Sequence, residues 1–277
     1  MLPHAQGGRR TYLGEPLLDR PRELSRVSQT LEEAKANAGR GVLYARGFYS
    51  YLSGGHAEWS GTDLALYADL ADGFSGSAQF HHEYREERGD LGLASLAIRV
   101  APEIFVTSTV AAGNGVDYLP ITSLALEVSG PAPRTCRLRL GAVASTSWWA
   151  HAQRDLLLGG VARALLPGTF VAEGRVEATI TNAPDDTAHL GVRGTLAVAH
   201  GRHGRRVWQA RVAVGDEPAY APGQPLSLRD DALVLDAAVG LRGWVRRPYG
   251  YLVQLAGGHE VGGHVRVGGD LSVFLEF

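Results

Sequence analysis

Hydrophobic and polar residues alternate most regularly over the last fourteen residues of the chain, 264–277 (HVRVGGDLSVFLEF). One parity of this segment carries Val265, Val267, Leu271, Val273, Leu275 and the terminal Phe277. The other parity is mainly polar, as at Arg266 and Asp270, with Phe274 as the exception. Alternation with a period of two predicts a β-strand with one apolar and one polar face. Such a strand could close a soluble β-sandwich or a membrane β-barrel, so the rest of the chain has to distinguish them.

From residue 41 onward the chain contains only segments with strand patterns, separated by turn residues. We expect about fourteen strands: 41–53, 59–71, 74–86, 91–101, 104–113, 120–130, 135–147, 153–165, 169–181, 187–200, 205–215, 231–246, 249–258 and 264–277. These segments are longer than the five or six residues common in soluble strands and match the roughly 9–11 residues that cross a bilayer at a tilt. An even number of strands is what a closed antiparallel barrel requires when both of its ends lie on one side.

The expected connections between these segments alternate in length. Tight connections follow the even-numbered segments: 72–73, 102–103, 131–133, 166–168, 201–204 and 247–248. Longer connections mostly follow the odd-numbered segments: 54–58, 87–90, 114–119, 148–152, 182–186, 216–230 and 259–263. Short periplasmic turns and longer extracellular loops are typical of outer-membrane barrels, whereas a Greek-key sandwich has no reason to produce them.

The polar parity supplies the candidate functional residues. We expect charged side chains of both signs to line the lumen: Arg137, Arg139, Glu173, Arg175, Glu177, Arg193, Arg211, Asp236, Arg242, Arg266 and Asp270. They could pair across strands and fill a narrow lumen as a satisfied network. They could equally line a polar pore whose arginines hydrogen-bond to, and stack on, a passing sugar or acidic ligand.

Aromatic residues gather near the expected strand ends, where a membrane barrel carries its interfacial girdles. The girdle candidates are Trp59, Tyr84, Tyr118, Trp148, Trp149, Tyr220, Trp244, Tyr249 and Tyr251.

Residues 1–40 differ from the rest of the chain. Within them, 21–37 (PRELSRVSQTLEEAKAN) predicts a short helix with a thin apolar stripe, ended by glycines. Residues 1–10 contain no apolar core of a signal peptide, so we expect the mature form of an exported protein whose leader has been removed. No apolar run reaches the 18 or so residues of a transmembrane helix, which leaves barrel strands open.

Composition narrows the function classes only modestly. The net charge is −2, which gives no general attraction for nucleic acid. Lys35 is the only lysine, so nearly all positive charge is arginine, a residue suited to pairing inside a lumen. Cys136 is the single cysteine and cannot form an internal disulfide.

No catalytic or metal-binding motif is recognisable, and we expect no metal and no cofactor. His259 and His264 are spaced HExxxH rather than HExxH, and His81, His82 and Glu83 are neighbours on a strand, where side chains alternate between faces. The enzyme alternative is an outer-membrane lipid-modifying enzyme, which would need a Ser–His pair at the outer rim. Its candidate residues, none of them in a recognisable motif, are His56, Ser147, His151 and His259.

The terminal strand resembles the C-terminal targeting signal of bacterial outer-membrane β-barrels, in which the last strand ends on an outward-facing Phe or Trp. The matching positions are Leu271, Val273, Leu275 and Phe277. This resemblance implies that the barrel-assembly machinery recognises the C-terminal strand.

Residues 40 to 277 also resemble the YaiO-type outer-membrane proteins. The features that match are the tight Asp-Gly turn after the second segment, the charged EYREERGD stretch, the polar GDEPAYAPGQPLSLRDD loop and the terminal Phe277. The resemblance implies a single-chain barrel without established enzyme activity, and partners in polysaccharide synthesis or export. The chain departs from relatives that carry helical repeats before the barrel, because it has only the expected helix 21–37.

Together these observations predict an all-β protein: a transmembrane, up-and-down, antiparallel β-barrel over 41–277, preceded by a periplasmic segment over 1–40 with one short helix. We expect it in the bacterial outer membrane, in contact with outer-membrane lipids, with both termini periplasmic. The leading functional hypothesis is a channel or export component for a polar solute such as a surface polysaccharide, not an enzyme. The alternative is a non-conducting structural or assembly barrel that acts through residues 216–230 and the helix 21–37.

Overall fold

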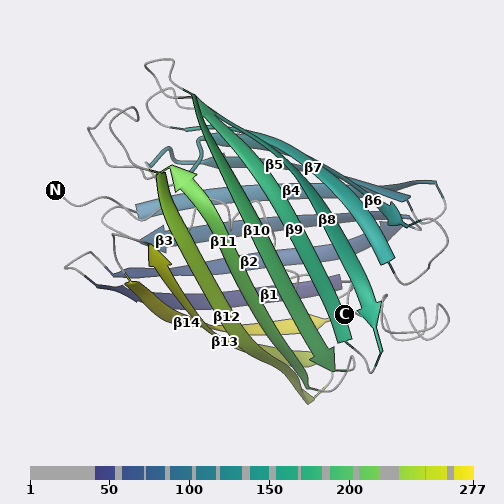
Figure 1. The fold of residues 1–277 in the computed structure, drawn as a ribbon. Coiled ribbons are helices and arrows are strands. Elements are labelled where there is room, and N and C mark those ends of the chain that lie inside the picture. Colours follow the sequence, from purple (N-terminus) through teal and green to yellow (C-terminus); the bar gives the residue numbers. More distant parts are fainter. Residues whose placement is uncertain are drawn as a thin grey trace.

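The chain after residue 40 forms one closed β-barrel (Figure 1). The computed structural model describes residues 41–53, 58–71, 73–84, 88–101, 104–116, 119–132, 138–149, 154–167, 170–182, 188–201, 206–218, 231–246, 248–260 and 265–277. The expected helix 21–37 and periplasmic segment 1–40 lie outside these residues and stay predictions.

Fourteen strands build the barrel. Their bounds are β1 Gly41–Leu52, β2 Trp59–Ala71, β3 Phe74–Tyr84, β4 Arg88–Ala101, β5 Ile104–Gly113, β6 Thr122–Pro131, β7 Leu138–Trp148, β8 Arg154–Leu166, β9 Phe170–Asn182, β10 Ala188–Gly201, β11 Val207–Pro218, β12 Asp231–Arg246, β13 Tyr249–Glu260 and β14 Val265–Glu276. Every bound lies within three residues of its prediction from the alternation pattern, and the strand number is confirmed. No helix in the described residues is long and apolar enough to cross a membrane.

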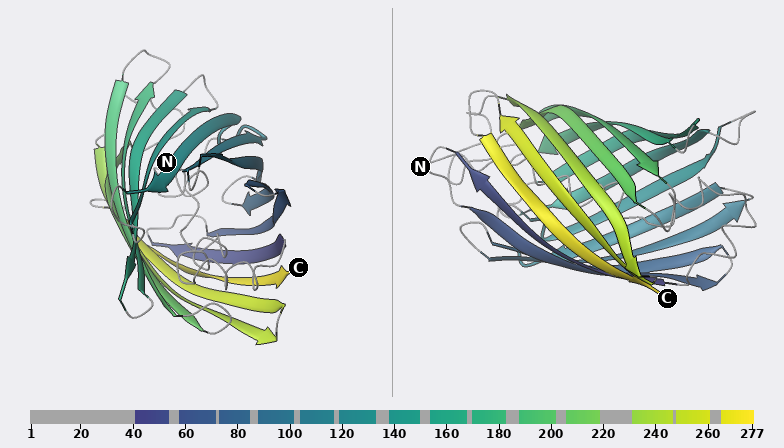
Figure 2. Two further views of the ribbon diagram at one scale, coloured as in Figure 1. Left: turned by 90° about the vertical axis from the view of Figure 1, so that its right-hand side faces the viewer. Right: turned by 90° about the horizontal axis from the view of Figure 1, so that it is seen from below.

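Each strand pairs antiparallel with its neighbours in the sequence, and β1 pairs with β14 to close the ring. The closing ladder runs from Val42 opposite Glu276 to Leu52 opposite Arg266. Reciprocal backbone hydrogen bonds between Gly41 and Phe277, at N···O distances of 2.7 and 3.0 Å, extend it to the last residue. The up-and-down barrel predicted from the sequence is therefore confirmed, and Figure 2 shows its strands running at a tilt around a curved wall.

The two ends of the barrel differ in their connections. We call the end with the connections after β2, β4, β8 and β12 the turn end, and the opposite end the loop end. Strand β1 begins and strand β14 ends at the turn end, because an even number of antiparallel strands brings the chain back to the end at which it started. Two expected lengths were wrong: β3 and β4 are separated only by residues 85–87, whereas β6 and β7 are separated by 132–137, at the turn end.

The turn end also concentrates the irregular pairings. Register shifts lie between Asp69 and Ala71, between Arg99 and Ala101, and between Trp244 and Arg246. An extra residue in one strand bends it and increases its twist, so bulges at a barrel rim help the sheet to close. Gly73 has a φ of 75° in the turn after β2, a conformation that favours glycine.

The two faces of the sheet are chemically opposite, because side chains alternate along every strand. On one face, large apolar side chains are exposed on all fourteen strands, for example Val176 at 62% and Leu255 at 65%. On the other face lie the buried charged residues, such as Glu173, Arg193 and Asp236. The parity predicted to be apolar in β14 is the exposed one, whereas the exceptional Phe274 is buried on the polar face.

Candidate functional site

Ion pairs that pass over an intervening strand identify the polar face as the inside of the barrel. Asp236 on β12 contacts Arg193 on β10 at 2.8 Å and Arg266 on β14 at 3.0 Å. Each pair skips one strand, which side chains can do only on the concave side of a closed sheet. Asp236 and Arg193 are both buried, so this carboxylate is the shared acceptor of two guanidinium groups inside the barrel.

A second cluster spans β6, β8 and β9. Arg163 donates to Glu173 and lies 3.6 Å from Glu127. Arg175 lies 3.8 Å from the other oxygen of Glu127 and 3.4 Å from Glu177. Glu127 therefore connects two arginines, each of which has a second carboxylate of its own.

A third cluster lies where β1, β2, β3 and β14 meet. Arg46 bridges Asp63 at 3.1 Å and Asp270 at 3.2 Å. His81 is fully buried, with Nδ1 2.5 Å from Asp63 and Nε2 3.2 Å from Glu83. Both ring nitrogens thus have carboxylate partners, which orients the imidazole from two sides.

Aromatic side chains occupy the inner wall near the turn end. The Arg242 guanidinium carbon lies 4.3 Å from the ring centre of Phe274 and 4.9 Å from that of Trp244. The two rings meet edge to face at 5.5 Å, across Gly250 on the intervening strand β13. A Cβ at Gly250 would overlap the Phe274 ring, so this close approach requires glycine there. Val42, Tyr44 and Ala65 pack against Phe274 and complete an apolar cluster.

A different chemistry is concentrated on the inner wall of β3–β7, beside the inward-facing Glu83 and Glu127 of the ion-pair clusters. Several inward positions there carry uncharged hydroxyl groups, which we call the hydroxyl sector: Ser77, Ser95, Thr109, Ser123, Ser145 and Ser147. Ser77 faces Ser95, and Ser95 faces Thr109, in direct cross-strand pairs. The Ser95 and Thr109 hydroxyls are 2.8 Å apart, and those of Ser123 and Ser147 are 3.1 Å apart.

The residues predicted to line the lumen fall into several of these groups. Glu173, Arg175, Glu177, Arg193, Asp236, Arg242, Arg266 and Asp270 all lie in the contacts above. Arg139 stands 5.7 Å over the Phe105 ring, Arg211 is half-buried on β11, and Arg137 lies outside the described residues. Contact with a passing solute stays a prediction for all of them.

Sequence reasoning missed the partners that complete these clusters. Arg46, Asp63, Glu127 and Arg163 are inward-facing ion-pair residues that were not singled out. Strand parity could have identified them, because each of these residues lies an even number of positions from another inward-facing residue of its strand, as Asp63 does from Ala65. What the sequence does not contain is which strands meet across the barrel.

The weak groupings considered from the sequence are not formed among the described residues, as strand alternation predicts for His81 and His82. His81 points inward and His82 outward to Asp90, at 2.7 Å, so the pair is divided between the two faces. Ser147 is buried on the inner wall beside Ser123, whereas His259 is exposed on the outer face of β13. His56, His151 and His264 are outside the described residues. The part of the chain that the structure describes contains no group of His, Cys, Asp or Glu able to hold a metal.

Only some of the aromatic residues predicted to form the girdle lie on the outer face. Tyr84 and Tyr249 are exposed on the outer face, as expected. Trp59 is instead buried under Arg266, whose guanidinium carbon lies 5.4 Å from its ring centre, and Trp244 also faces inward. Trp208, at 61% exposure, was overlooked. Tyr118 and Tyr220 lie outside the described residues.

Comparison with known proteins identifies the fold. No family model and no curated protein matches the chain. Among solved structures, a "CymD monoaromatic hydrocarbon channel" has a TM-score of 0.63 and 9% identity, over 99% of this chain and 94% of that one. A "bacterial polysaccharide outer membrane secretin" has a TM-score of 0.54 and 11% identity, over 86% and 99%. A loop L8 deletion mutant of OmpT, an outer membrane protein of Vibrio cholerae, has a TM-score of 0.52 and 7% identity, over 84% and 98%. The chain thus has the fold of outer-membrane β-barrel proteins.

Proposed function

We propose that this chain is an outer-membrane barrel whose inner wall provides a passage for a polar solute. The observation that carries the proposal is that this wall holds two kinds of polar surface: the hydroxyl sector on β3–β7, and ion-pair clusters that lie mainly on other strands but include Glu83 on β3 and Glu127 on β6. Hydroxyl groups both donate and accept hydrogen bonds, so a row of them can exchange partners with the hydroxyls of a moving solute. The charged clusters, which have their partners within the wall, hold its shape.

The balance of charge favours recognition through hydrogen bonds rather than through net charge. Each arginine of the three clusters contacts at least one carboxylate. A wall in which arginine charge is matched by carboxylate charge has a weak net field, and so it selects neither anions nor cations strongly. An uncharged polyhydroxylated molecule, such as a sugar chain, fits this surface best.

Membrane insertion is supported by the outer face. A continuous set of exposed apolar side chains on all strands suits hydrocarbon rather than water, and tight turns on one side suit the periplasmic end. We infer that the start of β1 and the end of β14 face the periplasm. We also infer that the C-terminal assembly signal consists of Leu271, Val273, Leu275 and Phe277. The YaiO-type relationship and polysaccharide export belong to this proposal; the solved structures that share the fold include a polysaccharide secretin, which is in keeping with export.

The alternative function is a non-conducting barrel that acts through its loops and protein partners. The observation that favours it is the apolar cluster of Val42, Tyr44, Ala65 and Phe274 at the turn end. Buried ring contacts of this kind would have to move aside if a hydrated solute passed along that part of the wall.

Single-channel conductance of the refolded full chain separates the two functions, together with swelling of vesicles in neutral sugars. We expect conductance with little ion selectivity, and slower sugar entry in Thr109→Val, which removes an inward hydroxyl at nearly constant volume. Ser108→Ala is the matched control, because Ser108 is exposed on the outer face of the same strand. A silent protein with no sugar entry would contradict the passage and favour the non-conducting barrel.

Membrane location has its own test. Val176 is exposed near the middle of β9, so Val176→Arg should lower the unfolding free energy in lipid vesicles by about 2–4 kcal/mol. Val245 is 82% exposed at the rim, where the same substitution should cost about 0–1 kcal/mol. Equal costs at the two depths would show that the outer face does not meet a hydrocarbon layer.

A further inference from the structure

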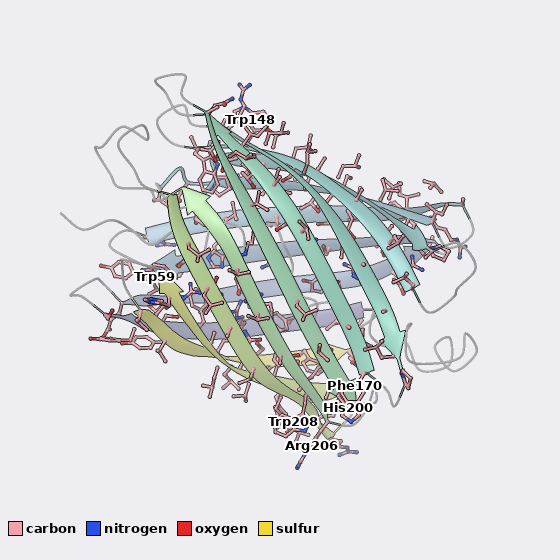
Figure 3. The ribbon with its side chains drawn as sticks, viewed as in Figure 1. Trp59, Trp148, Phe170, His200, Arg206 and Trp208 are labelled. Atoms are coloured by element: carbon pink, nitrogen blue, oxygen red, sulfur yellow. The ribbon has the colours of Figure 1, made fainter. Side chains whose placement is uncertain are left out.

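We propose that the outer face of β9–β11 at the turn end binds the phosphate headgroup of an anionic phospholipid. The residues are Phe170, His200, Arg206 and Trp208, here called the rim patch. The inference rests on the membrane location proposed above but not on passage of a solute, because the rim patch lies on the outer face. Figure 3 shows its four side chains together at the lower end of the barrel, far from Trp148 at the opposite rim.

The rim patch is a single row across three strands. His200 on β10 is directly opposite Phe170 on β9 and directly opposite Trp208 on β11. The His200 and Phe170 rings are stacked, with centres 4.1 Å apart and planes at 27°. Cross-strand pairing thus holds a polar ring between two apolar ones on a rigid sheet, which lowers the entropy cost of binding to it.

The aromatic rings of the rim patch face outward rather than into the protein. Trp208 is 61% exposed and Phe170 is 39% exposed. Exposed indole at the end of a membrane strand sits at the boundary between acyl chains and headgroups, because its ring is apolar and its N–H is a hydrogen-bond donor.

Arg206 then reaches the level of the phosphates. It is exposed and precedes Trp208 by two residues toward the turn. Two residues of a strand tilted by about 40° advance roughly 5 Å along the membrane normal, the step from the acyl boundary to the phosphate layer. A guanidinium group there can make two parallel hydrogen bonds to phosphate oxygens, and the His200 imidazole contributes an N–H donor in either tautomer.

Local charge complements an anion. The described outward-facing residues of β9–β12 at this end include Leu241 and Val245 but no carboxylate. The loop-end rim of β3 and β4 is different, since Arg88 there already contacts Asp90 at 3.1 Å. Arg88 also lies opposite the exposed Tyr84, so it has an aromatic neighbour, but its guanidinium group is already paired with a carboxylate.

Native mass spectrometry of the full chain tests the proposal, with phosphatidylglycerol and phosphatidylcholine as the added lipids. In the double variant His200→Gln, Arg206→Gln, we expect retention of phosphatidylglycerol to fall about fivefold and that of phosphatidylcholine to stay constant. Arg88→Gln, the matched control, should change neither. Arg206→Lys should keep most of the retention, since the charge remains.

Quenching of tryptophan fluorescence by brominated lipids gives a second readout on folded protein. Brominated phosphatidylglycerol should quench the chain more than brominated phosphatidylcholine does, and Trp208→Phe should abolish most of that difference. Equal retention in the double variant and the control would overturn the proposal. A second result would also overturn it: the unmodified chain is found as a dimer, and the double variant is a monomer that retains the lipid. The rim patch would then contact a second copy of the chain. The Val176→Arg experiment tests membrane location independently, so a failure of lipid binding at the rim patch can be distinguished from a failure of the proposed membrane location.

Discussion

The charged clusters and the hydroxyl sector show two ways of placing polar groups on the inside of one barrel. Two of the three clusters contain ion pairs that cross over intervening strands, as Asp236 does to Arg193 and Arg266 and as Glu127 does to Arg163. The hydroxyl sector makes its contacts between directly facing strands, as Ser95 does to Thr109. The first arrangement ties distant strands together, whereas the second adds only to contacts that the sheet already makes.

The difference has an energetic meaning. A buried ion needs its partner, since removing one member of a pair leaves an uncompensated charge at a cost of about 3–5 kcal/mol. A neutral hydroxyl bond contributes only about 0.5–1.5 kcal/mol, because water or a solute hydroxyl can replace it. The clusters therefore set the cross-section of the barrel, while the hydroxyl sector is the part of the wall that can exchange partners with a solute.

The largest effect is expected at Asp236, the acceptor of two arginines. Asp236→Asn keeps the shape of the side chain but removes the carboxylate that Arg193 and Arg266 share. We expect the unfolding free energy, measured by urea titration of the vesicle-bound barrel, to fall by about 3–5 kcal/mol.

The combined replacement Asp236→Leu, Arg193→Met, Arg266→Met sharpens this prediction. Removing all the charges together should restore most of the stability, since an apolar triad of similar volume carries no desolvation cost. If the triple variant were no more stable than Asp236→Asn, packing around Asp236 rather than charge would account for the loss.

A smaller effect is expected at Glu127. Its contacts to Arg163 and Arg175, at 3.6 and 3.8 Å, are longer than those of Asp236. Both arginines also keep a second carboxylate, Glu173 or Glu177, when Glu127 is changed. Glu127→Gln should therefore cost about 1–2 kcal/mol in the same titration. A loss as large as that of Asp236→Asn would mean that the longer contacts of Glu127 contribute as much stability as the shorter contacts of Asp236.

The sequence predicted the fold more completely than the inner wall. Strand alternation depends on local parity, so segments such as 59–71 and 231–246 were predicted with their observed bounds. Parity also placed Asp270 and Arg242 on the polar face. The pairs themselves depend on register and on which strands curve toward one another, so the sequence did not join Arg46 on β1 to both Asp63 and Asp270.

Phe274 illustrates the same limit from the apolar side. Its position on the polar parity was visible in the sequence, but the reason for it is not local. The ring packs on Trp244 and Arg242 of β12, two strands away, in the space that Gly250 leaves on β13. An exception to alternation in one strand thus reflects a glycine and an aromatic residue in two others.

The smallest effect is expected in the hydroxyl sector, and it tests the comparison most directly. A double-mutant cycle with Ser95→Ala and Thr109→Val isolates the 2.8 Å contact between the two hydroxyls. We expect a coupling energy of about 0.5–1 kcal/mol by urea titration, the range for cross-strand polar pairs. The proposed passage of a polar solute predicts that the same variants also slow sugar entry into vesicles, because the hydroxyls would then contact the solute. A coupling energy near that of a buried ion pair, with an unchanged rate of sugar entry, would contradict this prediction. The hydroxyl sector would then stabilise the barrel in the same way as the charged clusters.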